Sequence, residues 1–156
     1  MPDLYLEDFS TGQSFRSGEL RVEAEDIKRF AAEFDPQPFH LDDEAARHTM
    51  FGGLAASGWH TAAITMKLSV TSDFKPAGGI IGVGFEELRW PRPVYPGDTL
   101  HVEGEVLDVR PSKSNPSRGL IKLRLSTVNQ RGEVVQLSVG HLVVPTRGAA
   151  AASSGA

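Results

Sequence analysis

Two kinds of hydrophobic spacing divide the chain. Between residues 22 and 70 the spacing is helical, and four residues recur at the i, i+3, i+4 and i+7 positions of one helix face: Ile27, Phe30, Ala31 and Phe34. Beyond Gly78 the period changes to two, as in half-buried strands. Three runs share this period: Leu100, Val102, Gly104 and Val106; Ile121, Leu123, Leu125 and Thr127; Val135, Leu137, Val139, His141 and Val143. We therefore predict helices first and strands second.

The first helix is predicted to end at Asp35. Pro36 disfavours the α region for the residue before it, and a second proline two positions later stiffens the chain again. The stretch from Asp35 to His40 is therefore expected to be a rigid loop. Asp42 is well suited to cap a short helix over residues 43–47.

Ser57 is a suitable N-cap for a longer helix that begins at Gly58. The apolar residues of this helix point to nearly every side: Trp59, Ala62, Ala63, Ile64, Met66 and Leu68. A helix of this kind is expected to be surrounded by other elements.

Turns are predicted at residues 95–98 and 130–133, and a further strand at residues 15–22. One apolar helix followed by antiparallel strands is an α+β arrangement, in which the sheet wraps round the helix as in the hot dog fold. We expect one such domain over residues 1–146. Its exposed edge strand predicts a homodimer or a higher homo-oligomer.

The last ten residues, 147–156, are mainly Ala and Ser and have little to bury, so this tail is predicted to be disordered. The chain has no cysteine, which excludes disulfides, thiolate metal sites and a cysteine nucleophile. The net charge of -4 does not suggest a nucleic-acid partner. No apolar run is long enough to span a membrane and the N-terminus lacks a secretory signal, so a cytoplasmic protein is expected.

The segment FAAEFDPQPFHLD, residues 30–42, places Asp35 five residues before His40. It resembles the signature of the MaoC-like dehydratase family, to which (R)-specific enoyl-CoA hydratases belong. The resemblance continues through FGGLAASG at residues 51–58 and PVYPGD at residues 93–98, and covers nearly all of the chain except the tail. It implies a hot dog enzyme that acts on a 2-enoyl thioester.

Hydration of a C2–C3 double bond requires a base for the attacking water and an acid that protonates C2. A carboxylate and an imidazole can share these tasks, and positioned groups of this kind contribute about 10² to 10⁴ in rate. The resemblance assigns them to Asp35 and His40, and the sequence leaves open which of the two is the base. Taken singly, Asp35 is better explained as the end of a helix, and His40 as a turn residue packed on its aromatic neighbour, and only the surrounding pattern reverses this preference.

Negative charge also develops on the thioester oxygen during the reaction. The resemblance assigns its stabilisation to the backbone N–H of Gly58, at the start of the central helix. Many relatives have histidine immediately before this glycine, whereas this chain has Ser57. Ser57 and Trp59 are candidate substrate-binding residues, although helix capping and core packing also explain them.

The loop at residues 111–119 carries two further candidates, Lys113 and Arg118, which are predicted to bind the phosphates of CoA or of a carrier-protein pantetheine. A solvated hairpin loop explains them as well. No metal is expected, because the five histidines lack zinc-site spacing. No tightly bound cofactor is expected either, because residues 79–84 lack the spacing of a dinucleotide-binding fingerprint.

The predicted function is reversible addition of water to a 2-enoyl thioester, with R stereochemistry implied by the resemblance. Two alternatives stay open. A hot dog acyl-CoA thioesterase would use the same helix start but attack the carbonyl carbon, and the fold alone does not separate the two reactions. A non-catalytic thioester-binding protein would keep the fold without converging Asp35, His40 and Gly58 on one cavity.

Overall fold

A computed structural model describes residues 3–148. The helices are the 3₁₀ turn η1 (Leu6–Asp8), α1 (Ala24–Phe34), α2 (Pro38–Leu41), α3 (Asp43–Arg47) and α4 (Gly58–Val70). The strands are β1 (Ser14–Arg16), β2 (Leu20–Arg21), β3 (Ile81–Arg89), β4 (Thr99–Pro111), β5 (Arg118–Val128) and β6 (Val134–Pro145). The predicted order of helices followed by strands is thus confirmed for the long elements.

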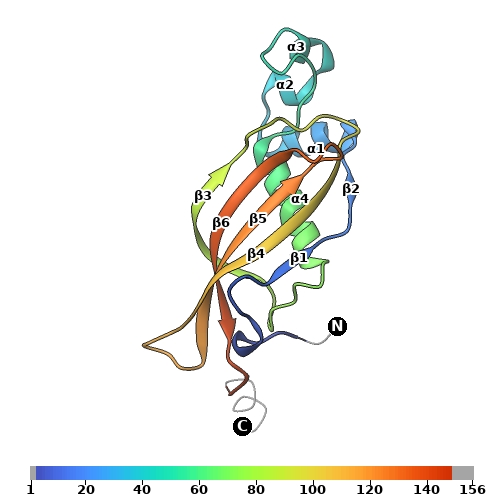
Figure 1. The fold of residues 1–156 in the computed structure, drawn as a ribbon. Coiled ribbons are helices and arrows are strands. Elements are labelled where there is room, and N and C mark those ends of the chain that lie inside the picture. The colour runs from blue at the N-terminus through green and yellow to red at the C-terminus, as the bar shows by residue number, and fades with distance from the viewer. Residues whose placement is uncertain (1–2, 149–156) are drawn as a thin grey trace.

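One sheet forms the body of the molecule, with strand order β1-β4-β5-β6-β3 and every pair antiparallel. β2 pairs with the first residues of β4. The long helix α4 lies against one face of this sheet, while α1, α2 and α3 gather at one end of it (Figure 1). This is the predicted hot dog fold, a single α+β domain.

Helix α4 begins where the sequence predicts. Ser57 caps it by accepting a hydrogen bond from the Trp59 N–H at 3.2 Å. The helix is, however, not surrounded in the single chain, because Trp59 is 58% exposed and Met66 is 48% exposed. Toward the sheet it buries hydroxyl groups, and the Thr65 Oγ1 lies 2.6 Å from the Thr127 Oγ1 of β5. The expectation of burial on all sides is therefore wrong for the isolated chain.

Two local predictions need correction, and one strand was not predicted. The strand predicted at residues 15–22 is two short strands, β1 and β2, separated by residues 17–19. The stretch before His40 is not wholly a loop, because α2 begins at Pro38, which is favourable at the first position of a helix where its missing N–H is not needed. Strand β3 is not identifiable from the hydrophobic spacing. Glycine occupies two of its first four positions, 82 and 84, and interrupts the strand pattern. The edge of the sheet is therefore a strand that only the structure reveals.

Strand β6 carries apolar residues at alternating positions of both parities, so spacing alone does not identify its inner face. The register decides it. Leu123 and Leu125 of β5 lie opposite Gly140 and Ser138 of β6, and directly opposed residues share a face of the sheet. Leu123 and Leu125 line a cavity beside α4, so the even-numbered residues of β6 from Gln136 to Leu142 face this helix, and polar side chains are among them.

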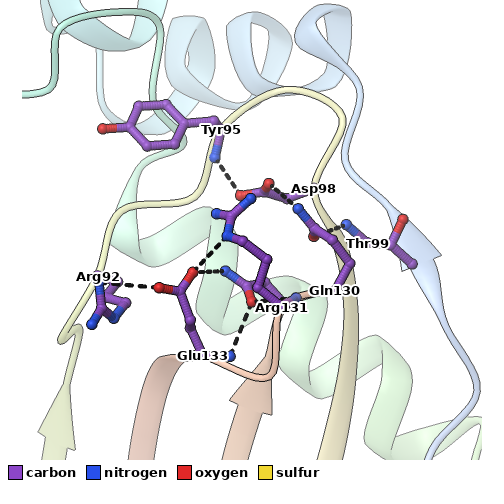
Figure 2. Close-up of polar contacts among 8 residues, drawn as sticks. Arg92, Tyr95, Asp98, Thr99, Gln130, Arg131 and Glu133 are labelled. Atoms are coloured by element: carbon purple, nitrogen blue, oxygen red, sulfur yellow. Dashed lines mark hydrogen bonds and ion pairs between the residues drawn. The ribbon is translucent and has the colours of Figure 1, made fainter.

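The predicted turns at residues 95–98 and 130–133 are present and are tied to each other (Figure 2). The buried Asp98 carboxylate accepts hydrogen bonds from the Tyr95 N–H at 3.0 Å and from the Gln130 side chain at 2.9 Å. Gln130 in turn accepts from the Thr99 N–H. An ion pair between Arg92 and Glu133 extends this network, which holds the segment before β4 firmly against the end of the sheet.

Most of the predicted tail lies outside the described residues, so its disorder stays a prediction. Of residues 147–156, Arg147 and Gly148 are described, and Arg147 forms an ion pair with Asp8. Over residues 3–148, no helix has the length and hydropathy needed to cross a membrane.

Candidate active site

Asp35, His40 and Ser57 come together above the start of α4. Asp35 terminates α1, His40 lies on α2, and Ser57 caps α4. The Ser57 hydroxyl donates a hydrogen bond of 2.7 Å to Asp35 Oδ2, and the same oxygen lies 3.3 Å from His40 Nε2. Three segments that are separate in the sequence thus meet at one carboxylate oxygen.

The protonation of the His40 ring follows from its other contact. Nδ1 lies 2.6 Å from the backbone carbonyl of Ala55, which can only accept a hydrogen bond, so Nδ1 carries the proton. In the neutral ring Nε2 is then an unprotonated base directed at Asp35. Nε2 and Asp35 Oδ2 are 3.3 Å apart, so a water molecule beside the pair can contact both groups. The arrangement suits a general base that gains a charge partner on accepting a proton.

The Asp35 carboxylate is held in its ionised form. Partial burial raises its pKa, but hydrogen bonds from Ser57 and Gln37 and the charge of His40 outweigh burial, so the pKa lies below its usual value. Gln37 donates to Oδ1 at 2.5 Å, which leaves Oδ2 for Ser57 and His40. Asp35 is therefore a weak base at neutral pH and a persistent negative charge beside the imidazole.

Backbone hydrogen bonds clamp the segment that leads into α4. The Ala55 N–H donates to the Phe39 carbonyl at 3.1 Å, and the Ala56 N–H donates to the Val94 carbonyl at 2.8 Å. The Tyr95 hydroxyl donates to the Phe51 carbonyl at 2.8 Å. Residues 51–56 are thus fixed between α2 and the segment anchored by the Asp98 network. This fixes the position of the Ala55 carbonyl, which orients His40.

Gly58 is the first residue of α4, and the indole of Trp90 packs directly on it. A Cβ at this position would lie 2.7 to 3.0 Å from three atoms of the Trp90 ring. Within residues 3–148, no acceptor pairs with the Gly58 N–H, as is usual at the first turn of a helix. Glycine is required here for close packing, while the predicted role of its N–H toward an oxyanion stays a prediction.

A cavity of about 360 Å³ extends from this helix start, between α4 and strands β3, β5 and β6. Trp59 lines its mouth and stacks edge-on against Trp90, with ring centroids 5.2 Å apart. None of Asp35, His40, Ser57 and Gly58 lines this cavity, and Asp35 and His40 lie beyond Ser57, at its helix end. The convergence of the pair and Gly58 on one cavity, expected of a hydratase, is therefore not seen within the single chain. Its size and largely apolar walls are suited to an acyl chain.

The structure does not bring Lys113 and Arg118 to this site within one chain. Both lie at the β4–β5 hairpin, where they line a groove of about 610 Å³ together with Arg110. This hairpin and helix α2 are at opposite ends of the sheet (Figure 1). The 13 residues of β4 separate them, a length of roughly 43 Å at about 3.3 Å per residue.

The histidine of helix α4, His60, lies outside the site. His60 is buried and its ring stacks on Phe30, with centroids 4.8 Å apart, and burial lowers its pKa. Its Nδ1 has no hydrogen-bond partner among the described residues. Across residues 3–148, no group of three or more His, Asp and Glu side chains is arranged to hold a metal ion.

Three residues that the sequence does not single out support the predicted site. Gln37 holds the Asp35 carboxylate, Trp90 covers Gly58, and Gln136 of β6 accepts a hydrogen bond of 2.8 Å from the Trp90 indole. Gln37 stands between the two prolines that follow Asp35, which is a usable signal. Gln136 is a polar residue in an apolar strand, but its inward direction depends on the register of β6.

Comparison with known proteins places these features in a family. Residues 8–129 match the family model described as MaoC like domain. The MaoC-like dehydratase from Rhodospirillum rubrum is 62% identical, with a TM-score of 0.89 over 92% of this chain and 98% of that one. Protein YdeM of Bacillus subtilis strain 168, described as uncharacterized, is 40% identical over 81% of this chain and 88% of its own length. R-hydratase PhaJ1 from Pseudomonas aeruginosa is 29% identical, with a TM-score of 0.73 over 93% of this chain and 88% of that one.

Substitution Gly58→Ala is expected to lower the free energy of unfolding by about 1–3 kcal/mol, because the added methyl group overlaps the Trp90 ring. Trp90→Ala removes the overlap, so Gly58→Ala should cost much less in that background. Urea unfolding of the two single variants and the double variant measures this coupling. Equal costs in both backgrounds would show that Trp90 does not restrict residue 58.

The lowered pKa of Asp35 predicts a particular dependence of stability on pH. Its ionised form stabilises the fold above the pKa in the unfolded chain, about 3.9, and this contribution disappears as pH falls through the lower pKa in the folded protein. Between pH 6 and 2.5, the free energy of urea unfolding should therefore fall further for the parent protein than for Asp35→Asn. Asp73→Asn, at an exposed position, should parallel the parent protein. A parallel curve for Asp35→Asn is the contrary result.

Proposed function

Because the chain belongs to the family of MaoC-like dehydratase domains, we propose that it adds water reversibly across the C2–C3 double bond of a 2-enoyl thioester. Family membership supports hydratase or dehydratase chemistry in general. The more specific proposal is an enoyl-CoA substrate and an R product. The observation that carries it is the His40 ring, with Nδ1 anchored on Ala55 and Nε2 directed at Asp35, one serine away from the start of α4.

His40 is the proposed base. A water molecule donates a hydrogen bond to Nε2 and is oriented by the Asp35 carboxylate, and its oxygen attacks C3 as its proton passes to Nε2. Asp35 is the poorer proton acceptor because its pKa is lowered, and its negative charge stabilises the imidazolium that forms. The imidazolium then returns the proton to C2, so that one proton and one hydroxyl are added.

The electrons of the double bond move transiently onto the thioester oxygen as C3 is attacked. The Gly58 N–H, at the positive end of α4, is the proposed donor to this oxygen. Ser57 connects the two halves of the mechanism, since its hydroxyl binds Asp35 and also caps the same helix. Its proposed part is to position the carboxylate relative to the oxyanion site.

A homodimer is proposed to complete the site. β3 is an edge strand with exposed apolar residues: Val83 is 59% exposed, and Phe85, which lines the cavity beside α4, is 66% exposed. If two β3 edges pair antiparallel around a twofold axis, the hairpin end of one copy lies beside the α2 end of the other. This arrangement would carry Lys113 and Arg118 toward the partner's site, where their charges would bind substrate phosphates.

Hydration is tested by the loss of 2-enoyl absorbance of crotonyl-CoA and longer analogues, with free thiol measured in parallel. The parent protein should remove the absorbance without releasing thiol. His40→Ala and Asp35→Asn should each lower kcat by at least about 10²-fold, because each removes a group that contacts the reacting water. The matched controls His48→Ala and Asp73→Asn, both at exposed positions, should keep parental rates.

Other outcomes of this assay distinguish the two alternatives. Release of thiol with the acyl chain otherwise unchanged would identify a thioesterase. Binding of the thioester without any change in absorbance, over the whole panel, would identify a binding protein. Equal loss in the exposed control variants would show that the effect is not specific to the pair.

The dimer is tested by light scattering on the full chain, which should have twice the mass of one copy. Val83→Lys, which puts a charge on the exposed edge, should give a monomer with little hydration activity. Lys113→Ala and Arg118→Ala should raise KM for CoA thioesters by about fivefold to tenfold with kcat nearly unchanged, since each removes a charged hydrogen bond. Arg16→Ala, on the outer face of the sheet, is the control. An active monomer, or an unchanged KM, would contradict this assembly.

A further inference from the structure

The acyl cavity is not apolar throughout. Two polar side chains of β6, Gln136 and Ser138, line it, and each residue is only 3% exposed. They stand two positions apart on one strand and therefore share the face that is directed at α4. A cavity that served only hydrocarbon chains would have no use for hydrogen-bonding groups in its wall.

The orientation of the Gln136 amide is determined by Trp90. An indole N–H can only donate, so the atom that lies 2.8 Å from it must be the Gln136 carbonyl oxygen. The NH₂ group is therefore the free end of this side chain. No acceptor for it is present within residues 3–148, and it is not sealed from the cavity.

Ser138 likewise has a polar group that is unpaired among the described residues. Its hydroxyl has no hydrogen-bond partner within the described part of the chain, and it too is accessible from the cavity. The other hydroxyls of the wall differ, because Thr65 and Ser69 of α4 donate to backbone carbonyls one helical turn earlier. Gln136 and Ser138 thus supply unused donors, while their neighbours on the helix do not.

We propose that the preferred substrate carries a neutral oxygen group, a keto or hydroxyl group, on its acyl chain beyond the double bond. This proposal rests on the proposed function. This oxygen accepts hydrogen bonds from the Gln136 amide and the Ser138 hydroxyl. A carboxylate is disfavoured, because the described lining contains no Lys or Arg and because the Nε2 of its one histidine, His141, pairs with Glu86. Gln136 and Ser138 are then specificity-determining residues.

Binding is measured first, by calorimetry, so that the test does not depend on turnover. The probes are saturated hexanoyl-CoA, its keto and hydroxy derivatives at C4, C5 or C6, and the matching chain that ends in a carboxylate. At least one keto or hydroxy derivative should bind about tenfold more tightly than hexanoyl-CoA. Equal affinity across the series, preference for the carboxylate, or no binding of any thioester would overturn the proposal.

Variants then assign the preference to these side chains. Ser138→Ala and Gln136→Met should each reduce the ratio of affinities, oxygenated over unsubstituted, by about threefold to tenfold. Ser126→Ala makes the same change as Ser138→Ala on the outer face of the sheet and should leave the ratio unchanged. A ratio that survives both cavity substitutions would show that the oxygen is recognised elsewhere.

Turnover separates this inference from the proposed function. If the 2-enoyl forms of the same chains are not hydrated although the saturated oxygenated chains bind preferentially, the reaction is wrong and the specificity stands. If all are hydrated with no preference for oxygen, the function stands and the specificity fails.

Discussion

The hydrogen bond from Ser57 to Asp35 is the contact on which the arrangement of the site depends. Ser57 is fully buried and its hydroxyl has two partners, the Asp35 carboxylate and the Trp59 N–H of α4. A single oxygen thereby connects the end of α1 to the beginning of the central helix. The distance between the Asp35 carboxylate and the Gly58 N–H follows from this one residue, and the proposed mechanism requires both groups to keep it.

The second constraint is the layer of side chains around Gly58. Trp90 packs on the glycine, touches Trp59 and donates its indole N–H to Gln136. The ring therefore links the helix start to the wall of the acyl cavity. Any substitution that moves Trp90 is expected to alter the start of α4 and the cavity together, because close-packed interiors transmit small displacements.

The outer supports of the site are made by backbone and turn chemistry. Residues 51–56 are hydrogen-bonded to α2 on one side and to the 94–95 segment on the other, and the buried Asp98 holds that segment in place. His40 receives its orientation from a carbonyl of this clamped stretch. The imidazole is thus oriented by the hydrogen bond of its Nδ1, which directs Nε2 at Asp35, an arrangement that suits the proposed general base.

The sequence by itself determined the elements whose signals are local. Pro36 ends α1 at Asp35, Ser57 caps α4, and alternating apolar residues mark the three long strands, because each signal acts through steric or hydrogen-bonding effects within a few residues. The resemblance of the surrounding motifs to the MaoC-like family, and not the local pattern alone, selected Asp35, His40 and Gly58 as candidates. Only the tertiary structure decided what depends on contacts between distant segments. It assigned the proton to Nδ1 of His40 and turned the even-numbered residues of β6 inward. It also showed β3 as the edge strand and separated Lys113 and Arg118 from the site of their own chain. Register, packing and the choice between two ring nitrogens follow from partners that lie far away in the sequence, and spacing along the chain carries no information about them.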